Sequence, residues 1–274
     1  MIGVFDSGSG GLTILKALTE QLPDQDFLYF GDHGNAPYGH RSNEQIVDLT
    51  KSGVARLMDA GCTLVILACN TAAAVALRSL QENWLPVHFP ENRILGVLVP
   101  MVEAITGVPW SQQSQSPIRN AEKILLLATQ KTVASGAYEE EVNKRAPQVD
   151  LVQKACPGLV DAIEGGAGPL PLRGLIEGFI SETTTDGVST AVLGCTHFPL
   201  IEGYFQAALP QGTSILSQPR IVANALADYL DRHSHFKKTG SGHVTLLTTG
   251  DPVTVNNVSR RFVNDKLKFD PANK

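Results

Sequence analysis

The sequence lacks any sizeable cluster of basic residues. Among its 274 residues, 22 are Lys or Arg and 27 are Asp or Glu, which gives a net charge of −5. No basic run is longer than a doublet such as Arg260-Arg261. Because nucleic acids and anionic membranes attract basic surfaces, this charge distribution disfavours both as main partners.

Long hydrophobic runs are also missing. Every apolar run is interrupted by Gly, Pro or a charged residue well before the length needed to cross a bilayer. The first residues, MIGVFDSGSGG, contain neither a basic region nor a cleavage site typical of a secretory signal. We therefore expect a globular protein in the cytoplasm, although a secreted chain whose signal has been removed would look the same.

Cysteines are few, and none of them forms a C-x-x-C pair. The four are Cys62, Cys69, Cys156 and Cys195. This spacing disfavours zinc-ribbon and thioredoxin-type sites, and we expect no metal site and four free thiols. An isolated cysteine is most often a small buried apolar residue, and we interpret Cys62 and Cys156 in this way.

Short apolar runs alternate with helical patterns along the chain, which predicts an α/β fold with mainly parallel sheets. The pattern restarts near residue 123, after a Ser-, Gln- and Pro-rich stretch at 108–120 that we interpret as a linker or a surface loop. Strands are expected at 2–5, 27–30, 64–68, 94–97, 123–128, 149–153, 191–193, near 215 and at 244–247. Helices are expected at 11–21, 43–59 and 71–80, from the end of the strand at 123–128 to about 144, at 158–164 and 171–181, after 198, and at 222–232 and 255–263.

Two of the expected strands end in a cysteine followed by small polar residues. LVILACNTAA places Cys69 between a strand and a helix that Thr71 could cap, and TAVLGCTHFPL places Cys195 in a similar setting. The positive end of a helix stabilises a thiolate, so a modest downward shift of the pKa is expected at both positions. His197 could order a proton at Cys195.

A pair of matching thiols favours one kind of chemistry. A single thiol with a base is typical of a covalent nucleophile. Two thiols can instead remove a proton from one face of a carbon and deliver a proton to the opposite face, which inverts a stereocentre. The α-proton of an amino acid is weakly acidic, so nearby donors would have to stabilise the carbanion character.

Two glycine-rich turns add candidate residues. DSGSGG, residues 6–11, follows the first strand and fits a dinucleotide fingerprint poorly, although its backbone N–H groups suit a carboxylate or phosphate. Asp6 lies at the C-terminal end of a strand, where α/β proteins generally have their binding and catalytic sites. Alternatively, Asp6 or Ser7 could cap the helix that follows. In GDHGNAPYGHR, residues 31–41, Tyr38 is either a packed aromatic or a hydroxyl held over a pocket.

Four segments give the sequence a family resemblance. They are GVFDSGSGGLT near the start, NAPYG at 35–39, ACNTA at 68–72 and GCTHFPL at 194–200. In this order and spacing they resemble glutamate racemases, within the cofactor-independent aspartate/glutamate racemase family. The resemblance covers nearly the whole chain and implies interconversion of L- and D-glutamate without pyridoxal phosphate or metal, supplying D-glutamate for peptidoglycan.

The resemblance also implies roles for individual residues. Cys69, assisted by Asp6, would deprotonate the D-enantiomer, and Cys195, assisted by His197, would deprotonate the L-enantiomer. Glu164, in ACPGLVDAIEGG, matches a family glutamate near the second thiol. Substrate would be held by Asp6, Ser7, Pro37, Tyr38, Gly39, Cys69, Asn70, Thr71, Cys195, Thr196 and His197.

The same resemblance implies two pseudo-symmetric domains, each a mainly parallel sheet flanked by helices, with the active site in the cleft between them. Residues 1–98 and 206–274 would form the first domain, and residues 99–205 would form the second, inserted domain. The protein would act as a homodimer on a small-molecule substrate.

Other functions remain open. Family members often carry an arginine at the position of Asn35. This difference motivates the hypothesis that the protein has the same fold but acts on a different substrate, such as aspartate or a hydantoin. A non-catalytic protein that binds a small dicarboxylate would also use glycine turns and helix ends, with inert buried thiols. A hydrolase with one nucleophilic thiol is disfavoured, because it would leave the second strand-end cysteine without a role.

Overall fold

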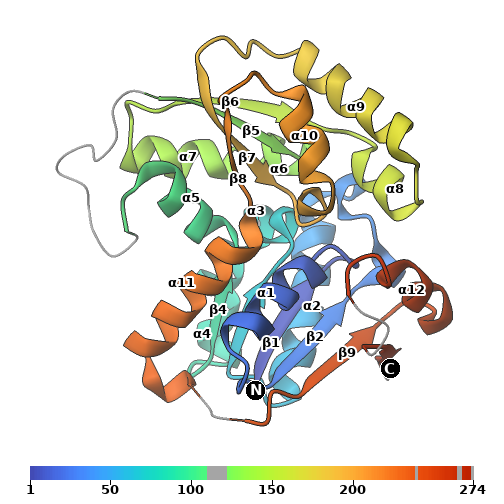
Figure 1. Ribbon diagram of the computed structural model, residues 1–274. Coiled ribbons are helices and arrows are strands. Elements are labelled where there is room, and N and C mark those ends of the chain that lie inside the picture. Colours follow the sequence, from blue (N-terminus) through green and yellow to red (C-terminus); the bar gives the residue numbers. More distant parts are fainter. Residues whose placement is uncertain (110–121, 238–239, 264–266, 273–274) are drawn as a thin grey trace.

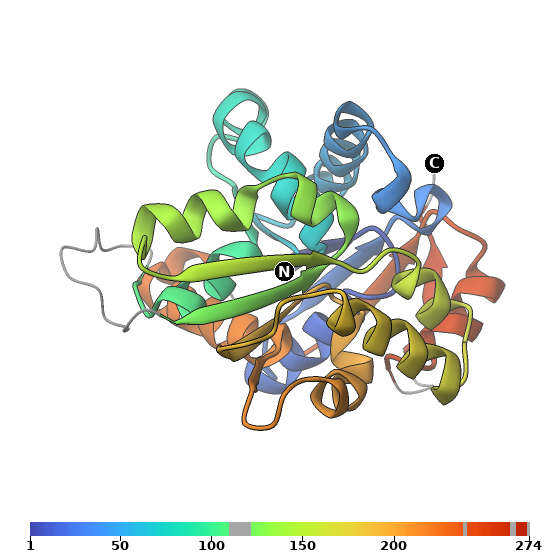
Figure 2. The ribbon, with the colours of Figure 1, turned by 90° about the horizontal axis from the view of Figure 1, so that it is seen from above.

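The computed structural model describes residues 1–109, 122–237, 240–263 and 267–272. In these ranges two parallel β-sheets form the framework, and helices cover both faces of each sheet (Figures 1 and 2). From residue 110 onward, the expected linker at 108–120 lies outside the described residues. Within the described ranges no helix is both long and apolar enough to cross a membrane.

The larger sheet has six strands in the order β10-β9-β2-β1-β3-β4, and we call the part of the chain built on it the first lobe. Its strands are β1 (Ile2–Asp6), β2 (Phe27–Gly31), β3 (Leu64–Leu67), β4 (Arg93–Gly96), β9 (Val244–Thr248) and β10 (Phe269–Pro271). One face packs against α1 (Leu12–Gln21) and α11 (Gln218–Arg232), and the other packs against α2 (Asn43–Asp59) and α3 (Asn70–Ser79). Because both faces are covered, β1, β2 and β3 are buried along their whole length.

The smaller sheet has four strands in the order β6-β5-β7-β8, and the part built on it is the second lobe. Its strands are β5 (Lys123–Ala128), β6 (Asp150–Ala155), β7 (Val188–Gly194) and β8 (Ser214–Leu216). One face packs against α8 (Leu159–Glu164), α9 (Pro169–Ser181) and α10 (Glu202–Ala208). The other packs against α5 (Leu98–Thr106) and α7 (Ala137–Arg145).

The remaining helical segments are short, apart from α12 beside the C-terminal strand. They are η1 (His33–Asn35), η2 (Tyr38–His40), the π-helix η3 (Leu80–Trp84), α4 (Leu85–His88), α6 (Gln130–Ala134), η4 (Phe198–Ile201), η5 (Ser234–Phe236) and α12 (Pro252–Ser259).

The predicted α/β class is confirmed, and each expected strand is present, with bounds within two residues except that β7 begins at Val188, three residues before the expected start. The sequence analysis missed α5 and β10. The second sheet also continues to β8, which pairs with β7 beyond residue 206, where the chain was expected to return to the first domain. The division into 1–98 plus 206–274 and 99–205 stays a prediction.

A buried hydrogen-bond network joins the two lobes near the start of α3. The side-chain amides of Asn70 and Gln218 bond each other reciprocally, with N···O distances of 2.7 and 2.8 Å. The Tyr138 hydroxyl, from α7 of the second lobe, donates to the Asn70 carbonyl oxygen at 3.0 Å. Because a buried polar group without its partner is costly, this network fixes the position of α3 against the second lobe.

Gly53 provides a test of the packing between α2 and the first sheet. A Cβ at Gly53 would overlap the ring of Phe5, whereas a Cβ at Gly174, inside α9, would meet no atom within 4 Å. We expect Gly53→Ala to lower the free energy of unfolding by about 1–3 kcal/mol through overpacking. The matched control Gly174→Ala should raise it by roughly 0.5–1 kcal/mol, the usual gain in a helix. Urea denaturation measures both, and a stabilising Gly53→Ala would contradict the packing described.

Candidate active site

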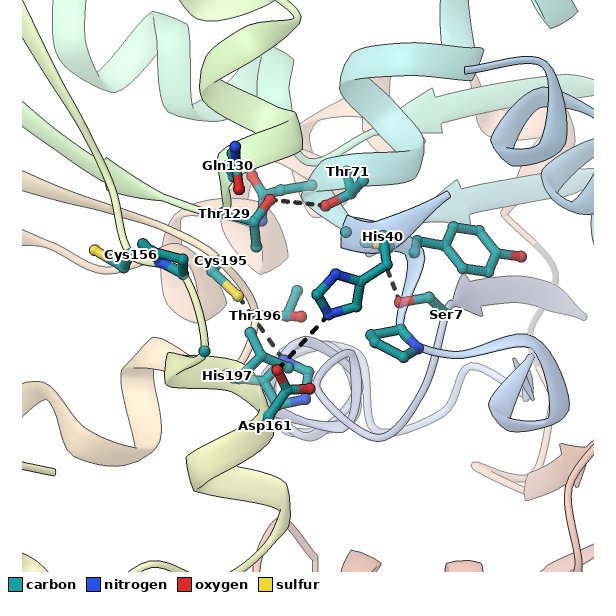
Figure 3. Close-up of a pocket in the computed structure, with 18 residues that line it drawn as sticks. Ser7, His40, Thr71, Thr129, Gln130, Cys156, Asp161, Cys195, Thr196 and His197 are labelled. Carbon is teal, nitrogen blue, oxygen red and sulfur yellow. Dashed lines mark hydrogen bonds and ion pairs between the residues drawn. The ribbon is translucent and has the colours of Figure 1, made fainter. Parts of the chain in front are cut away.

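A pocket lies between the lobes, where the carboxyl ends of strands from both sheets meet. This is the edge at which α/β proteins generally bind their ligands. Each of five strands contributes a side chain directly after or near its end: Ser7 after β1, Cys69 after β3, Thr129 after β5, Cys156 after β6 and Cys195 after β7. Figure 3 shows Thr129 and Cys195 of the second lobe on one side of this pocket and Ser7 on the other.

Cys69 begins α3 as its N-cap residue. The Cys69 Sγ accepts a hydrogen bond from the Ala72 backbone N–H at 3.5 Å and lies 3.4 Å from the Ser7 hydroxyl. The expectation that Thr71 caps this helix is therefore wrong, because Thr71 already lies within α3. Its hydroxyl instead bonds that of Thr129 across the lobes at 3.0 Å.

The environment of Cys69 raises the pKa of its thiol. Burial is the largest cause and the negative charge of Asp6 is the next, and together they raise the pKa to about 12. The bonds from Ser7 and Ala72 act in the opposite direction but are outweighed. The expected downward shift of the pKa is thus wrong for Cys69, because burial destabilises the thiolate more than the N-terminal end of the helix stabilises it. At neutral pH Cys69 is a protonated thiol.

Cys195 lies in a different setting from Cys69. Strand β7 ends at Gly194 and the 3₁₀ segment η4 begins only at Phe198, so Cys195 caps no helix. Its Sγ lies 3.8 Å from Nδ1 of His197. The neighbour that was expected to order a proton at this thiol is therefore in contact with it.

His197 connects the Cys195 thiol to Glu164. Its Nε2 lies 2.7 Å from Oε1 of Glu164, at the end of α8. Burial alone would lower the pKa of His197, but the bonds and charges of Cys195 and Glu164 raise it to about 10. Burial likewise raises the pKa of Glu164, and the contact with His197 lowers it below its usual value. Near neutral pH the pair is an imidazolium and a carboxylate.

Asp6 lies behind the pocket and does not line it. It is fully buried, and its carboxylate accepts hydrogen bonds from the Gly8 N–H at 2.8 Å and from the Thr196 hydroxyl at 3.4 Å. Burial raises the pKa of Asp6 to about 6, against the lowering effect of His197. Helix α1 starts after Gly11 without a side-chain cap, so the capping interpretation of Asp6 and Ser7 is not supported.

The glycines of the DSGSGG turn allow the two lobes to touch. A Cβ at Gly10 would overlap the imidazole of His197 and the hydroxyl of Thr196. Thr13, in the next turn, donates from its hydroxyl to the Thr196 carbonyl at 2.9 Å. The sequence therefore needs glycine here for close packing on the second lobe rather than to form a dinucleotide site.

The NAPYG loop is held by a buried carboxylate outside the pocket. Asp32 accepts hydrogen bonds from the Tyr38 hydroxyl at 2.7 Å, the Asn35 amide at 3.0 Å and the Thr249 hydroxyl at 2.7 Å. Tyr38 is thus a packed aromatic whose hydroxyl is anchored on Asp32, and its side chain also lines the pocket. Asn35 supports the loop and is not among the residues that line the pocket.

Most of the residues expected to hold substrate line this one pocket. They are Ser7, Pro37, Tyr38, Gly39, Cys69, Asn70, Thr71, Cys195, Thr196 and His197. Of the remaining expected site residues, Asp6 reaches the pocket through Thr196, and Glu164 reaches it through His197.

Sequence reasoning assigned no site role to the other eight lining residues, although several lie in the quoted segments 31–41 and 155–166. These eight residues are His40, Thr129, Gln130, Cys156, Pro157, Gly158, Val160 and Asp161. His40 of the first lobe and Asp161 of the second form an ion pair at 3.8 Å (Figure 3). Thr129 and Cys156 directly follow β5 and β6, so the rule that ligands bind at the carboxyl ends of parallel strands could have identified both.

The described residues around the pocket lack the groups that usually hold a metal ion or pyridoxal phosphate. In the described part of the chain, no three His, Cys, Asp or Glu side chains are arranged to bind a metal ion. The described lining of the pocket contains no lysine, the residue to which pyridoxal phosphate is attached.

The sequence and fold match one family of enzymes. A sequence profile of the family described as Asp/Glu/Hydantoin racemase matches residues 2–226. The chain belongs to this racemase family. It is thus an isomerase, and its sequence is 45% identical to a protein named glutamate racemase from Phenylobacterium zucineum, with 99% of both chains covered.

Solved structures of racemases have the same architecture. A glutamate racemase from Thermus thermophilus, in complex with β-chloro-D-alanine, is 31% identical and superimposes with a TM-score of 0.83 over 99% of this chain and 96% of its own. One from Francisella tularensis, in complex with D-glutamate, is 25% identical with a TM-score of 0.83 over 98% and 95%.

The charge state of His197 in this racemase can be tested directly. Because its folded-state pKa of about 10 exceeds the ordinary 6.5, His197 should stay protonated from pH 6 to 9. In Glu164→Gln the partner charge is lost, so the midpoint should fall by one unit or more, about the effect of one neighbouring opposite charge. NMR titration of the histidine ring protons measures both. A wild-type midpoint near 6.5 would contradict the ion pair.

Proposed function

We propose that the protein is a glutamate racemase that interconverts L- and D-glutamate by proton transfer at Cα between two cysteines. The observation that carries the proposal is that Cys69 and Cys195, one from each lobe, line the same pocket. The names of the relatives and the D-glutamate complex of the Francisella tularensis enzyme support glutamate as the substrate.

The unequal environments of the two thiols suit an acid and a base. Cys69, with its pKa raised to about 12, is the proton donor, since it remains a thiol at neutral pH. Cys195, whose Sγ lies 3.8 Å from Nδ1 of His197, is the proton acceptor. In this state Cys195 takes the α-proton of L-glutamate and Cys69 delivers a proton to the other face.

The reverse direction exchanges these roles. Delivery of its proton to the carbanion leaves Cys69 as the thiolate, which can in turn take the α-proton of D-glutamate. Asp6, with a pKa of about 6, assists because a general base works best when its pKa is near the working pH. His197 and Glu164 assist Cys195. The hydroxyls of Ser7 and Thr71, the Asn70 amide and the backbone N–H groups of Tyr38 and Gly39 offer donors that hold the two carboxylates and stabilise the carbanion character.

The wider role follows from the proposed reaction. A racemase of this kind supplies D-glutamate for peptidoglycan, and we infer this role, a cytoplasmic location and a homodimer for the chain. Similarity to glutamate racemases along the full length of the sequence supports the inference.

Asn35 does not favour the alternative substrates. Its amide is used by Asp32, so the replacement of the family arginine changes the support of the loop and not the lining of the pocket. We therefore favour glutamate over aspartate or a hydantoin.

Incubation in heavy water tests the proposal. With either enantiomer of glutamate, deuterium should enter Cα and the other enantiomer should form. Cys69→Ser and Cys195→Ser should each lower kcat by about 10²–10⁴-fold, the range for loss of a general acid or base. Cys62→Ser is the matched control, because Cys62 is buried away from the pocket and should leave kcat unchanged.

The other functions predict different results in the same assay. A dicarboxylate-binding protein would bind glutamate without deuterium exchange, and a hydrolase with one thiol would tolerate serine at one of the two positions. Faster turnover of aspartate or a hydantoin than of glutamate would show a different substrate. Any of these outcomes contradicts the proposal.

A further inference from the structure

The turn after α12 belongs to the first lobe but contacts the proton-transfer groups of the second. Ser259, the last residue of α12, and residues 260–262 form this contact, and α12 lies beside α8 in both views of the molecule (Figures 1 and 2). None of them lines the pocket. The sequence analysis expected a helix over 255–263, which in the structure already ends at Ser259, and it gave the Arg260-Arg261 doublet no role.

Arg261 binds the end of α8 through two backbone carbonyls. Its Nη1 donates to the carbonyl oxygens of Ile163 and Glu164, both at 2.9 Å. A cation that bonds the last carbonyls of a helix also interacts favourably with the negative helix end. Gly166 makes room for this contact, since a Cβ there would overlap the guanidinium, and its φ of +75° is one that glycine adopts easily.

Phe262 and Ser259 extend the contact on either side of Arg261. The buried Phe262 ring meets the His197 imidazole edge-on, with centroids 5.7 Å apart and planes at 86°. The Ser259 hydroxyl lies 3.3 Å from that of Ser9, and the Ser9 N–H in turn bonds the Glu164 carboxylate. The same turn therefore contacts His197 directly and borders Glu164 from two directions.

Backbone bonds from Gly165, Gly166 and Ala167 to the carbonyls of Asp161, Ile163 and Ala162 close the end of α8, and the Glu164 carbonyl itself is bonded by Arg261. Glu164 is the last residue of a six-residue helix, and Gly165 and Gly166 follow it. Glycines leave the backbone more freedom than any other residue, so the carboxylate position depends on what holds this helix end. Arg261 supplies such a restraint from the opposite lobe.

We propose that Arg261 is a positioning residue for proton transfer at Cys195. By fixing the Glu164 backbone, it keeps the carboxylate in contact with His197 and the imidazolium in contact with the thiol. This inference rests on the proposed racemase function for its catalytic consequence, but the restraint on Glu164 and His197 is independent of turnover.

Removal of the guanidinium tests the proposal. Arg261→Met keeps the apolar stem and loses both hydrogen bonds. The charged or titratable groups that face His197 are Cys195, Glu164, Asp6 and His33, so the titration of His197 reports on its contact with Glu164. We expect its NMR midpoint to fall by about one unit. We expect kcat for both enantiomers to fall roughly ten- to a hundredfold, the scale of a small misplacement of a catalytic group.

Two further variants complete the experiment. Arg261→Lys retains a cation, so the midpoint of the His197 titration and kcat should both lie between those of Arg261→Met and the wild type. Arg93→Met is the matched control, because the Arg93 guanidinium also bonds two backbone carbonyls, at 3.1 and 2.8 Å, but at the start of β4. KM should change little in any variant, since Arg261 touches no lining residue.

The possible outcomes separate the inference from the proposed function. A wild-type midpoint and kcat in folded Arg261→Met, or equal losses in Arg93→Met, would overturn the positioning role. If Arg261→Met does not fold, Arg261→Lys decides, with an intermediate midpoint supporting the role and a wild-type midpoint refuting it. A lowered midpoint in a protein that never racemises glutamate would support the restraint and refute the function.

Discussion

The contact between His197 and Glu164, at 2.7 Å, is the interaction on which the rest of the site depends. A buried imidazole would ordinarily stay neutral, because removal from water penalises its charge. The carboxylate of Glu164 reverses this preference and keeps a cation next to Cys195. Cys69 has no such cation and faces the charge of Asp6 instead. Two chemically identical side chains thereby lie in opposite electrostatic environments.

The fold creates this asymmetry by joining two parallel sheets at their carboxyl ends. Strand ends bring the thiols to one pocket, and the glycine turn after β1 lets the first lobe pack directly on Thr196 and His197. Polar contacts across the lobes, such as that between Thr71 and Thr129, fix the position of one lobe relative to the other. Residues that lie behind the pocket matter because a buried charge needs a partner held in place.

The sequence predicts the framework well, because strands buried on both faces leave continuous apolar runs and their ends are marked by polar residues. It missed α5, which is short and carries Pro100, and β10, which has only three residues. The two thiols were found through their motifs. The direction in which the pKa of Cys69 shifts was predicted wrongly, because it depends on complete burial of the thiol, which only tertiary packing determines. Asp161 and His40 were missed because their contact crosses the lobes, and only the fold brings the two segments together.

The most direct test of this account is a crystal structure with D-glutamate bound. We predict that the sulfur atoms of Cys69 and Cys195 lie in contact with Cα on opposite faces, with the carboxylates held by donors of both lobes. Two sulfurs on the same face of Cα, or one of them too far from Cα to exchange a proton, would contradict inversion by paired thiols.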